Sequence, residues 1–462
     1  MTAATQAIAA FIHGHSFDDF PLAAVERSRK VIADTVAAML AGSSSEVTTP
    51  LLRYLHLDPE CGTSPLIGHR ERCLPETAAL INGCFGHALD FDDVLSMMPG
   101  HPSAVILAAL FADLGRHPLN GEQLIEAHVI GVEIGGKIGL GITNGHYRRG
   151  FHGTSTLGIF SAVAALCKAF RLPIPVIQTA LRIAGSMASG LRRNFGTMTK
   201  PLHTGWAARS AVTAVRLAMS GLTAAPDILE ARSGFFGTYG VDDSDVSVTM
   251  QNLGKPWVIV NPGIALKQFP CCYACHRGMD GILTLRSRHG FTAPDIRGAI
   301  CRMPPGGMQV LTYDNPQTGL EAKFSLPYAI AAGIIDGEYT LQTFTDEAVN
   351  RPAVREMMQR VRTFEDAACR GNDPLFDSRS SGIRGFVEID IELTSGARET
   401  IRIEKPPGHP DRELTWDTLS KKFSDCATHA GISSQLSNDA FACLRTLARD
   451  HDTASWLALL TR

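Results

Sequence analysis

The chain has 462 residues, 45% of them hydrophobic and 19% charged, which is the balance of a soluble globular protein long enough for two domains. Its formal charge of −3 comes from interspersed acids and bases without a basic block, which argues against nucleic acid and anionic membrane as partners. The N-terminus does not resemble a signal peptide, and no apolar run reaches membrane-spanning length, so we expect a cytoplasmic protein.

The hydrophobic pattern from the N-terminus to about residue 265 has the period of helices. The apolar residues from Val25 to Leu40 fall on one face of a segment that ends at Gly42. Several segments are rich in Ala and Gly on more than one face, which lets helices pack closely. The sequence therefore predicts a helical bundle, with further helices at residues 104–114, 155–170 and 206–220, and a helix over residues 79–90 is considered below.

After residue 265 the pattern changes. Residues 297–303 resemble a strand that ends at two prolines, and residues 386–393 alternate apolar and polar side chains. The turn TSGA and residues 400–404 complete the signal of a hairpin. From about residue 411 helical periodicity returns.

These patterns predict a mainly α protein with a large helical bundle domain and a smaller α+β domain. We expect the helical domain over residues 1–265 and the α+β domain over residues 266–410. Periodicity leaves two places open for the helices of residues 411–462, which would either rejoin the first domain or cap the second.

The eleven cysteines do not suggest a disulfide framework in a chain of this length, and most lie singly in apolar helical stretches. We therefore expect reduced thiols. The exception is CCYACH, in which Cys272, Cys275 and His276 have a spacing that a metal could use. A structural zinc site normally needs a second ligand pair, and the sequence offers none, so we predict no metal.

The stretch HALDFDDVLSMMPGHPSA, which begins at His87, gathers three aspartates between two histidines. If the preceding helix includes Asp90, His87 lies one turn before it, and His101 lies at the start of the next helix. Carboxylates and imidazoles at a loop between rigid elements are typical of acid–base chemistry. The alternative is structural: Asp92 and Asp93 would cap backbone amides, and His87 would be a core histidine.

Two further stretches place cations beside helix starts. GFHGTSTLG puts His152 just ahead of a helix that Thr154 and Ser155 would cap. GTMTKPLHTGWAAR puts Lys200 and His203 immediately before a long helix, where exposed amides make a ready carboxylate site. The alternative there is a solvated lysine and a capping threonine.

ALKQFPCCYACHRG adds Lys267, His276 and Arg277 at the point where the chain changes character. Ligands commonly bind between domains. The lysines and some of the histidines therefore predict a pocket for a small polyanion, in which Asp90 and Asp93 would orient or tune the histidines.

These stretches resemble the MmgE/PrpD family. The resemblance runs from about residue 20 to 430 through HALDFDD, GHPS, GFH with a downstream ST, TKPLH, KQFPCCYACH and EAKFSLPYA. It implies a helical larger domain, a smaller α+β lid domain, homodimers, and chemistry on small di- and tricarboxylates without a cofactor. The motif TKPLH resembles the decarboxylase and epimerase branches of the family more closely than it resembles the bacterial methylcitrate dehydratases.

Five residues match the decarboxylase branch in type, namely Asp90, His101, His152, Lys200 and Lys267. The resemblance also shows three departures. Val94 stands where that branch carries threonine, Cys272 where it carries histidine, and Gly153 where many members carry proline. Tyr313 is the candidate for the family's lid tyrosine.

We therefore predict a lyase, either a dehydratase or a decarboxylase, that moves a proton next to a carboxylate of a 2-alkylcitrate or cis-aconitate type of substrate. His101 and His152 would transfer protons, Asp90 would orient a histidine, and Lys200 and Lys267 would bind carboxylates. The expected substrate-binding residues are Asp93, His203, His276, Arg277 and Tyr313.

Three alternatives stay open. An epimerase needs two proton carriers, and Cys272 opposite a histidine would supply a softer acid or base. A non-catalytic protein that binds carboxylates would keep the fold without turnover. A metal-dependent hydratase could hold a hard cation with the three aspartates, although two lysines in the same pocket would offset that need.

Overall fold

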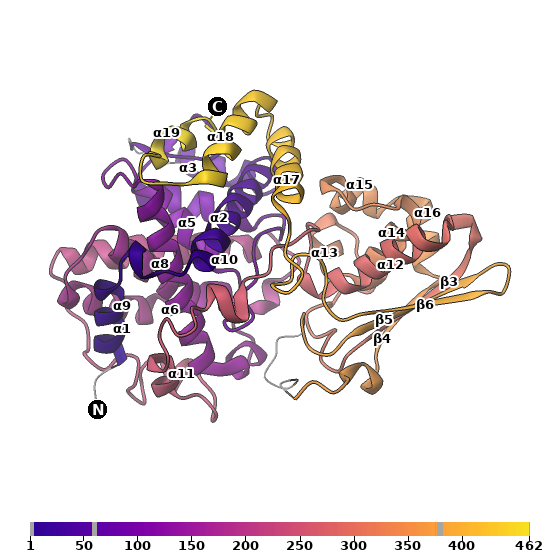
Figure 1. The fold of residues 1–462 in the computed structure, drawn as a ribbon, viewed down its shortest axis with the longest axis horizontal. Helices are drawn as coiled ribbons and strands as arrows, with labels where there is room; N and C mark the ends of the chain where they lie inside the picture. The colour runs from indigo at the N-terminus through magenta and orange to yellow at the C-terminus, as the bar shows by residue number, and fades with distance from the viewer. Residues whose placement is uncertain (1–3, 58–61, 375, 377–381, 462) are drawn as a thin grey trace. The chain divides into compact units, whose positions relative to one another are not determined.

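The computed structural model describes residues 4–57, 62–374, 376 and 382–461. These form two compact units (Figure 1). Unit 1 comprises Met1–Arg193, Met198–Ala265 and Thr415–Arg462, and unit 2 comprises Asn194–Thr197 and Leu266–Leu414. The prediction of a mainly α fold with a smaller α+β part is confirmed. No described helix combines the length and the hydropathy that crossing a bilayer requires.

Unit 1 is built almost entirely from helices in its described residues, with one short antiparallel pair of strands, β1 (Ser64–Pro65) and β2 (Arg72–Cys73). Its helices are α1 (Ala4–Gly14), α2 (Leu22–Gly42), α3 (Thr48–Leu57), α4 (Pro75–His87), α5 (Pro102–Ala112), α6 (Gly121–Arg148), α7 (Gly153–Thr156), α8 (Gly158–Ala169), α9 (Ile174–Met187), α10 (Thr199–Met219), α11 (Phe235–Tyr239), α17 (Trp416–His429), α18 (Ser434–Thr446) and α19 (Thr453–Ala458).

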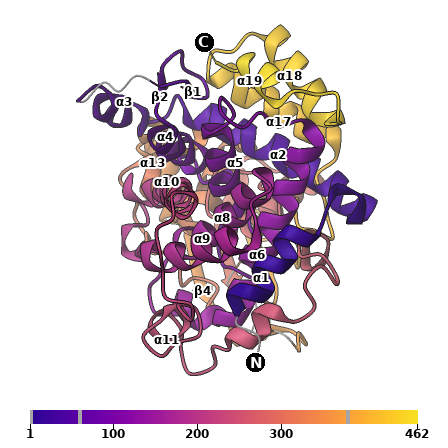
Figure 2. The same ribbon diagram turned by 90° about the vertical axis from the view of Figure 1, so that its left-hand side faces the viewer.

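Helix α5 forms the centre of unit 1. All of its residues are buried, because the sequence PSAVILAALFA carries no charged side chain on any face. Helices α4, α8 and α10 pack against it. The C-terminal helices α17 and α18 pack against α2, so the last part of the chain lies beside one of the first helices (Figure 2).

Helices α4 and α10 approach each other closely through glycine. A Cβ atom at Gly83 of α4 would lie 2.7 Å from the Cα of Gly205 in α10, and a Cβ at Gly205 would lie 2.0 Å from the carbonyl oxygen of Leu80. Gly83 lies about one turn from His87 on α4, and Gly205 lies about a turn and a half from Lys200 on α10. The small residues therefore let these two side chains meet.

Two expected helix boundaries are wrong, and both errors fall beside the candidate site. The helix expected to reach residue 90 ends at His87, because Asp90 adopts a left-handed conformation with φ 50°. The helix expected after TKPLH already begins at Thr199 and contains Lys200 and His203. Pro201 is compatible with this start, since the first turn of a helix needs no partner for its amide groups.

Unit 2 contains a four-stranded sheet in the order β4-β3-β5-β6. Strand β3 (Ile296–Met303) pairs in parallel with β4 (Val361–Glu365), whereas β5 (Val387–Leu393) is antiparallel to β3 and to β6 (Arg398–Ile403). The predicted hairpin is thereby confirmed. Helices α12 (His276–His289) and α14 (Leu326–Asp336) pack on the sheet, and the shorter helices are α13 (Gly319–Ala322), α15 (Asp346–Val349) and α16 (Pro352–Met358).

Candidate active site

The candidate site is built around the connection between α4 and α5, residues 88–101, which we call the site loop. Asp90 in this loop is one of few described non-glycine residues with positive φ. A left-handed aspartate costs roughly 1 kcal/mol or more, so surrounding contacts must hold it. The site loop therefore stores local strain beside its carboxylates.

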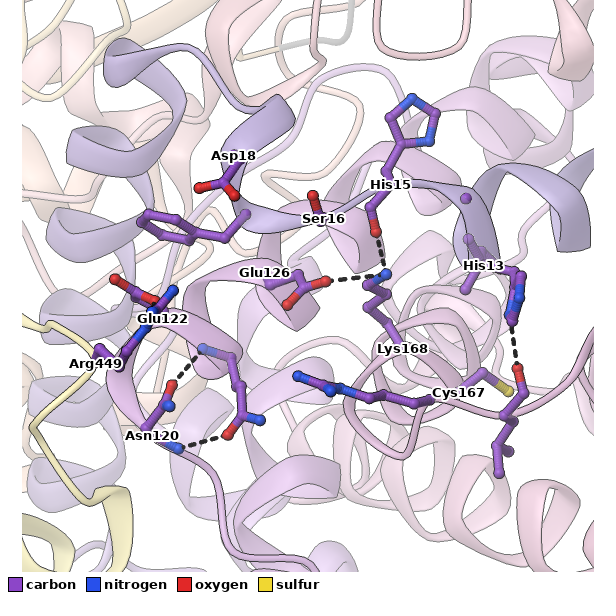
Figure 3. Close-up of a pocket in the computed structure, with 16 residues that line it drawn as sticks. His13, His15, Ser16, Asp18, Asn120, Glu122, Glu126, Cys167, Lys168 and Arg449 are labelled. Carbon is purple, nitrogen blue, oxygen red and sulfur yellow. Dashed lines mark hydrogen bonds and ion pairs between the residues drawn. The ribbon is translucent and has the colours of Figure 1, made fainter.

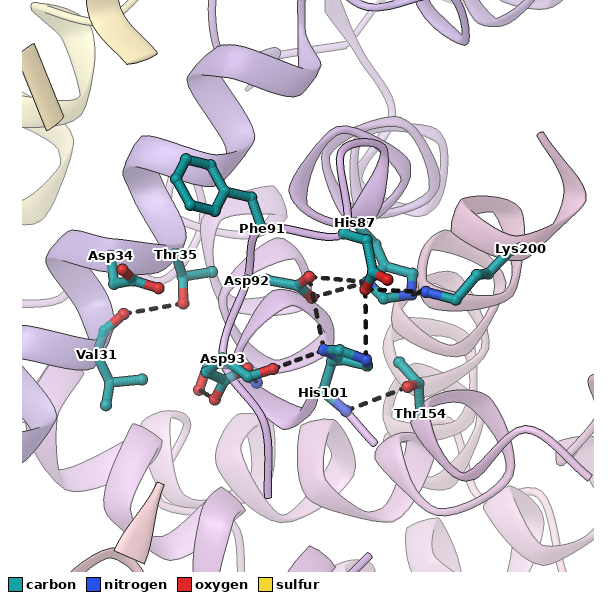
Figure 4. A network of polar contacts seen from close by, with 12 residues as sticks. Val31, Asp34, Thr35, His87, Phe91, Asp92, Asp93, His101, Thr154 and Lys200 are labelled. Carbon is teal, nitrogen blue, oxygen red and sulfur yellow. Dashed lines mark hydrogen bonds and ion pairs between the residues drawn. The ribbon is translucent and has the colours of Figure 1, made fainter. Parts of the chain in front are cut away.

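A chain of three charged or polar groups crosses from the site loop to α10 (Figure 4). His87 Nδ1 lies 2.9 Å from both carboxylate oxygens of Asp92, and His87 Nε2 lies 2.6 Å from Lys200 Nζ. Because a carboxylate only accepts and an ammonium only donates, His87 carries its proton on Nδ1 and accepts on Nε2. Lys200 Nζ also donates to Asp90 Oδ1 at 3.1 Å.

His101 is the histidine of this cluster with the most accessible ring. Its Nδ1 lies 2.6 Å from the carbonyl oxygen of Asp93, which can only accept, so Nδ1 bears a proton. Its Nε2 faces Asp90 Oδ1 at 3.7 Å. The His101 side chain is 12% exposed, against 5% or less for Asp90, Asp92, His87 and Lys200. Nε2 of His101 is thus suited to exchange a proton with a bound molecule.

A second pair of histidines lies next to this chain. His152 Nδ1 and His203 Nδ1 are 3.1 Å apart, so one nitrogen must donate to the other. Burial, with the nearby charge of Lys200, lowers the pKa of His203 to about 4. Burial and the same lysine lower the pKa of His152 well below its usual value. Both rings are therefore neutral at pH 7, and His87 lies 5.7 Å from His152 between ring centroids.

Neighbouring hydroxyl groups hold the loop and the histidines in place. Thr154 Oγ1 accepts from the backbone N–H of His101 at 3.1 Å, and Ser155 Oγ donates to the carbonyl of His203 at 3.0 Å. The expectation that these two residues cap a helix is wrong. The N-cap residue of α7 is His152, and Thr154 and Ser155 lie inside the helix. Their role is to connect α7 to the site loop and to α10.

The Asp93 carboxylate points away from the histidine rings. It accepts from the backbone N–H and the hydroxyl of Ser103 at 3.3 and 2.5 Å, and Ser103 Oγ lies 2.9 Å from His128 Nε2. Burial and the charge of Asp92 raise the pKa of Asp93 well above its usual value. The Asp93 side chain is thus fully buried and ties the site loop to the start of α5, and its contact with a substrate stays a prediction.

The cluster also has the composition of a cation site. His87, Asp90, Asp92 and His101 each offer a ligand atom, and these atoms lie within 4.8 Å of one another. However, the ammonium group of Lys200 already contacts two of the four, His87 and Asp90. A divalent ion would have to sit against that positive charge, so the lysine fits the site better than a metal does.

The remaining candidate residues belong to unit 2. Lys267 and His276 are fully buried, whereas Cys272 is half-buried at the start of a short turn, with its N–H donating to the carbonyl of Lys323 at 3.0 Å. The Tyr313 hydroxyl donates to the carbonyl of Phe195, another residue of unit 2, at 3.0 Å. These contacts hold Cys272 and Tyr313 against the backbone of unit 2.

Arg277 contacts the backbone of unit 2. Its guanidinium donates to the backbone carbonyls of Arg384 and Gly385 at 2.9 and 3.0 Å, and its side chain is fully buried. Two hydrogen bonds of the guanidinium are thus made within the chain, and the expected role in substrate binding stays a prediction.

Two of the departures from the family pattern have local structural consequences. Val94 pairs with Ala265 through two backbone hydrogen bonds of 2.8 and 3.0 Å, which need no side-chain hydroxyl. A Cβ atom at Gly153 would lie 2.2 Å from the carbonyl oxygen of Met98. The site loop therefore approaches α7 at a distance that only glycine permits here.

A separate cavity of about 480 Å³ lies among α1, α6 and α8 (Figure 3). Its lining includes none of the site residues that the sequence predicts. The charges in it are largely paired, since Lys168 contacts Glu126 at 2.9 Å and Arg449 contacts Glu122 at 2.8 Å. This cavity therefore differs from the cluster at the site loop, in which one ammonium faces several histidines.

His87 and Asp92 are not among the site residues that the sequence predicts. Their signal was a histidine at the C-terminal end of a helix, five residues before an aspartate. That spacing alone does not predict a contact between the two side chains. The contact forms because the chain turns back at Asp90, which brings Asp92 against the imidazole.

The buried lysine, the carboxylates and the histidines gathered in unit 1 are groups able to transfer protons on an anionic molecule. The MmgE/PrpD N-terminal domain matches residues 6–245 and the MmgE/PrpD C-terminal domain matches residues 269–445. The chain belongs to the MmgE/PrpD family, as the sequence motifs predicted.

Curated relatives of this chain are lyases by name. The cis-aconitate decarboxylase of Mus musculus is 29% identical over 99% of this chain and 92% of the relative, and that of Homo sapiens is 28% identical over 99% and 93%. The probable 2-methylcitrate dehydratase of Saccharomyces cerevisiae is 26% identical over 76% and 71%. The chain is thus an enzyme of the carbon–carbon or carbon–oxygen lyase type found in this family.

Proposed function

We propose that this protein is a cofactor-free lyase, a decarboxylase or dehydratase, for a small di- or tricarboxylate of the cis-aconitate or 2-alkylcitrate type. The observation that carries this proposal is the position of Lys200. Its buried ammonium contacts Asp90 and the His87–Asp92 pair, next to His101, whose side chain is 12% exposed. A fixed positive charge beside a proton carrier suits a reaction in which negative charge develops next to a carboxylate.

In this proposal Lys200 attracts a substrate carboxylate, and His101 exchanges a proton through Nε2. For decarboxylation, the bond to the departing carboxyl carbon breaks, its electron pair moves into the carbon skeleton, and a carbon atom takes the proton. For dehydration, a carbon next to a carboxylate loses a proton and the hydroxyl group leaves as water after protonation. The two reactions share the anion site and differ in which bond breaks.

The neutral pair of His152 and His203 adds a second route for protons. A bound polyanion would favour the protonated form of these rings, because opposite charge raises the pKa of a histidine. The pair would then gain a proton together with the substrate. Lys267 and Cys272 keep the roles of carboxylate binding and acid–base chemistry as predictions that rest on the family resemblance.

The test is proton NMR of the purified enzyme in deuterated buffer with citrate, 2-methylcitrate, longer alkylcitrates, cis-aconitate and iminodisuccinate, each with and without chelator. We expect an alkene product or carbon dioxide from one of these acids at a rate that the chelator does not change. Absence of any conversion across the panel would contradict the proposed substrate class, and loss of turnover with chelator would contradict chemistry without a metal.

An epimerase is the second candidate, and one observation favours it. Cys272 is half-buried, whereas the neighbouring thiols of Cys271 and Cys275 are buried. An accessible thiol could carry the second proton that an epimerase needs. Deuterium entering iminodisuccinate with its connectivity intact would favour this candidate, and the Cys272→Ser variant would then lose the exchange.

We also infer that the protein acts as a homodimer in the cytoplasm. Helix α10 leaves Leu202, Trp206 and Leu217 37–44% exposed, and a second copy would cover such an apolar stripe. The described cysteines are free thiols, which suits a reducing compartment. Light scattering should give twice the chain mass, and Trp206→Glu should shift it to that of one chain. Light scattering that gives one chain mass for the wild type would overturn the dimer.

A further inference from the structure

A lysine from the end of the chain contacts the site loop. Lys422 on α17 donates from Nζ to the backbone carbonyl of Phe91 at 2.8 Å, and the same ammonium lies 3.7 Å from the centroid of the Phe91 ring. It also donates to Asp34 Oδ1 of α2 at 2.6 Å. Its side chain is 6% exposed, so one ammonium group joins α2, α17 and the site loop inside unit 1.

Stability alone is a weak reason for such an arrangement. Burying an ammonium and a carboxylate costs several kcal/mol of desolvation for each ion, which their attraction only partly offsets, and apolar replacements are often as stable. The contact that an apolar side chain could not supply is the one to the Phe91 carbonyl. This points to a role in fixing the loop.

Phe91 lies between the two aspartates that face the cluster. Asp90 on one side is left-handed and sends its carboxylate to Lys200, while Asp92 on the other side sends its carboxylate to His87. The Phe91 carbonyl belongs to the peptide group that leads into Asp92, so its direction sets how the two side chains diverge. Figure 4 shows Phe91 and Asp34 on one side of this loop and His87 on the other.

We propose that Lys422 is a positioning residue of the active site: it holds the Phe91 peptide so that Asp90 and Asp92 reach Lys200 and His87. Sequence periodicity did not reveal it, because Lys422 is the polar neighbour of apolar residues on the buried face of α17. The expected effect on turnover rests on the proposed function, whereas the effect on the His87–Asp92 contact does not.

The experiment compares the double variant Asp34→Asn/Lys422→Met with the control Lys421→Met. The double variant removes both buried charges together, so no unpaired ion is left in the core. Lys421 is the neighbouring lysine on the same helix, and it is exposed. A third variant, Lys422→Arg, keeps the positive charge for Asp34 but replaces the compact ammonium with a planar guanidinium.

The first measurement is the proton resonance of His87 Nδ1–H in enzyme labelled with nitrogen-15 in its histidines, assigned by its absence in His87→Gln. We expect this resonance to be shifted or lost in the double variant and in Lys422→Arg, and unchanged in Lys421→Met. The second measurement is kcat/KM on the acid that the enzyme converts. It should fall about 10- to 100-fold in both Lys422 variants, since small displacements of catalytic groups cost rates of this size.

Circular dichroism establishes that each variant is folded. An unchanged His87 resonance in the folded double variant, or equal losses of kcat/KM in Lys422→Arg and Lys421→Met, would overturn the positioning role. If the wild type converts none of the acids, the proposed function fails on its own, and the histidine resonance still decides whether Lys422 holds the loop. If the double variant does not fold, Lys422→Arg provides the same test.

Discussion

The candidate residues of unit 1 contact one another through their side chains, whereas Arg277 and Tyr313 of unit 2 contact backbone carbonyls. In unit 1, Lys200, His87 and Asp90 are joined by hydrogen bonds of 2.6 and 3.1 Å between side chains. In unit 2, Arg277 and Tyr313 donate to backbone carbonyls. Side chains of similar type thus form a network with one another in one region and bind the backbone in the other.

The largest effect should come from Lys200→Ala. Removing the ammonium leaves Asp90 and the His87–Asp92 pair without their shared cation and removes the charge that would stabilise the reacting anion. We expect kcat/KM to fall by about 1,000-fold. Lys168→Ala, which breaks a lysine–glutamate pair elsewhere in unit 1, should change kcat/KM by less than about twofold. Equal losses of kcat/KM in the two variants would contradict a special role of Lys200 in the cluster.

His101→Gln should have the next largest effect. Glutamine keeps a polar group at the site but cannot exchange a proton, so we expect kcat to fall by about 100-fold and the pH dependence of kcat to lose one limb. His117→Gln is the control. His117 Nδ1 lies 3.2 Å from Asp113 Oδ2, and neither residue belongs to the cluster at the site loop. A pH profile of His101→Gln that retains both limbs would show that another group transfers the proton.

Arg277→Gln tests unit 2. The change removes charged hydrogen bonds to two backbone carbonyls, which should lower the free energy of unfolding by about 2 kcal/mol. The KM of the folded enzyme should not change, because the guanidinium is engaged with the chain. Urea unfolding and steady-state kinetics on the same preparation separate the two effects, and a raised KM at unchanged stability would restore Arg277 as a substrate ligand.

The smallest effect concerns pH. Burial lowers the pKa of His146 in unit 1 to about 4 from its usual 6.5. The unfolded chain therefore binds a proton that the folded chain does not, so His146 stabilises the fold above pH 6.5, and this stability is lost as pH falls toward 4. At pH 5.5 the loss is about 1.4 kcal/mol relative to pH 8.

His128 and His203 also make the fold less stable as pH falls, since burial lowers the pKa of each. Asp93 has the opposite effect on the pH dependence of stability, because its pKa is raised in the folded chain. The difference between the wild type and His146→Asn isolates one histidine from this sum. Urea unfolding at pH 8 and pH 5.5 should show a variant whose stability falls less with acid than the wild type's, and an equal fall in both would contradict the shift.

Much of the fold was predictable because it follows from local patterns. The helical period before residue 265, the strand that ends before Pro304 and the hairpin with the turn TSGA all depend on neighbouring side chains and on turn chemistry. The missed boundaries depend on contacts from elsewhere. Asp90 is left-handed in a loop held by Lys422, a residue more than 300 positions away in the chain.

The sequence by itself determined the family, the succession of helices and strands, and the set of residues able to carry charge or protons. Only the tertiary structure decided which of them meet. The close approach of α4 and α10 at Gly83 and Gly205 brings His87 to Lys200, and Ser103 takes the Asp93 carboxylate away from the histidine rings. The physical reason is that hydrogen bonds act over about 3 Å, whereas sequence motifs fix only the positions of neighbours along the chain.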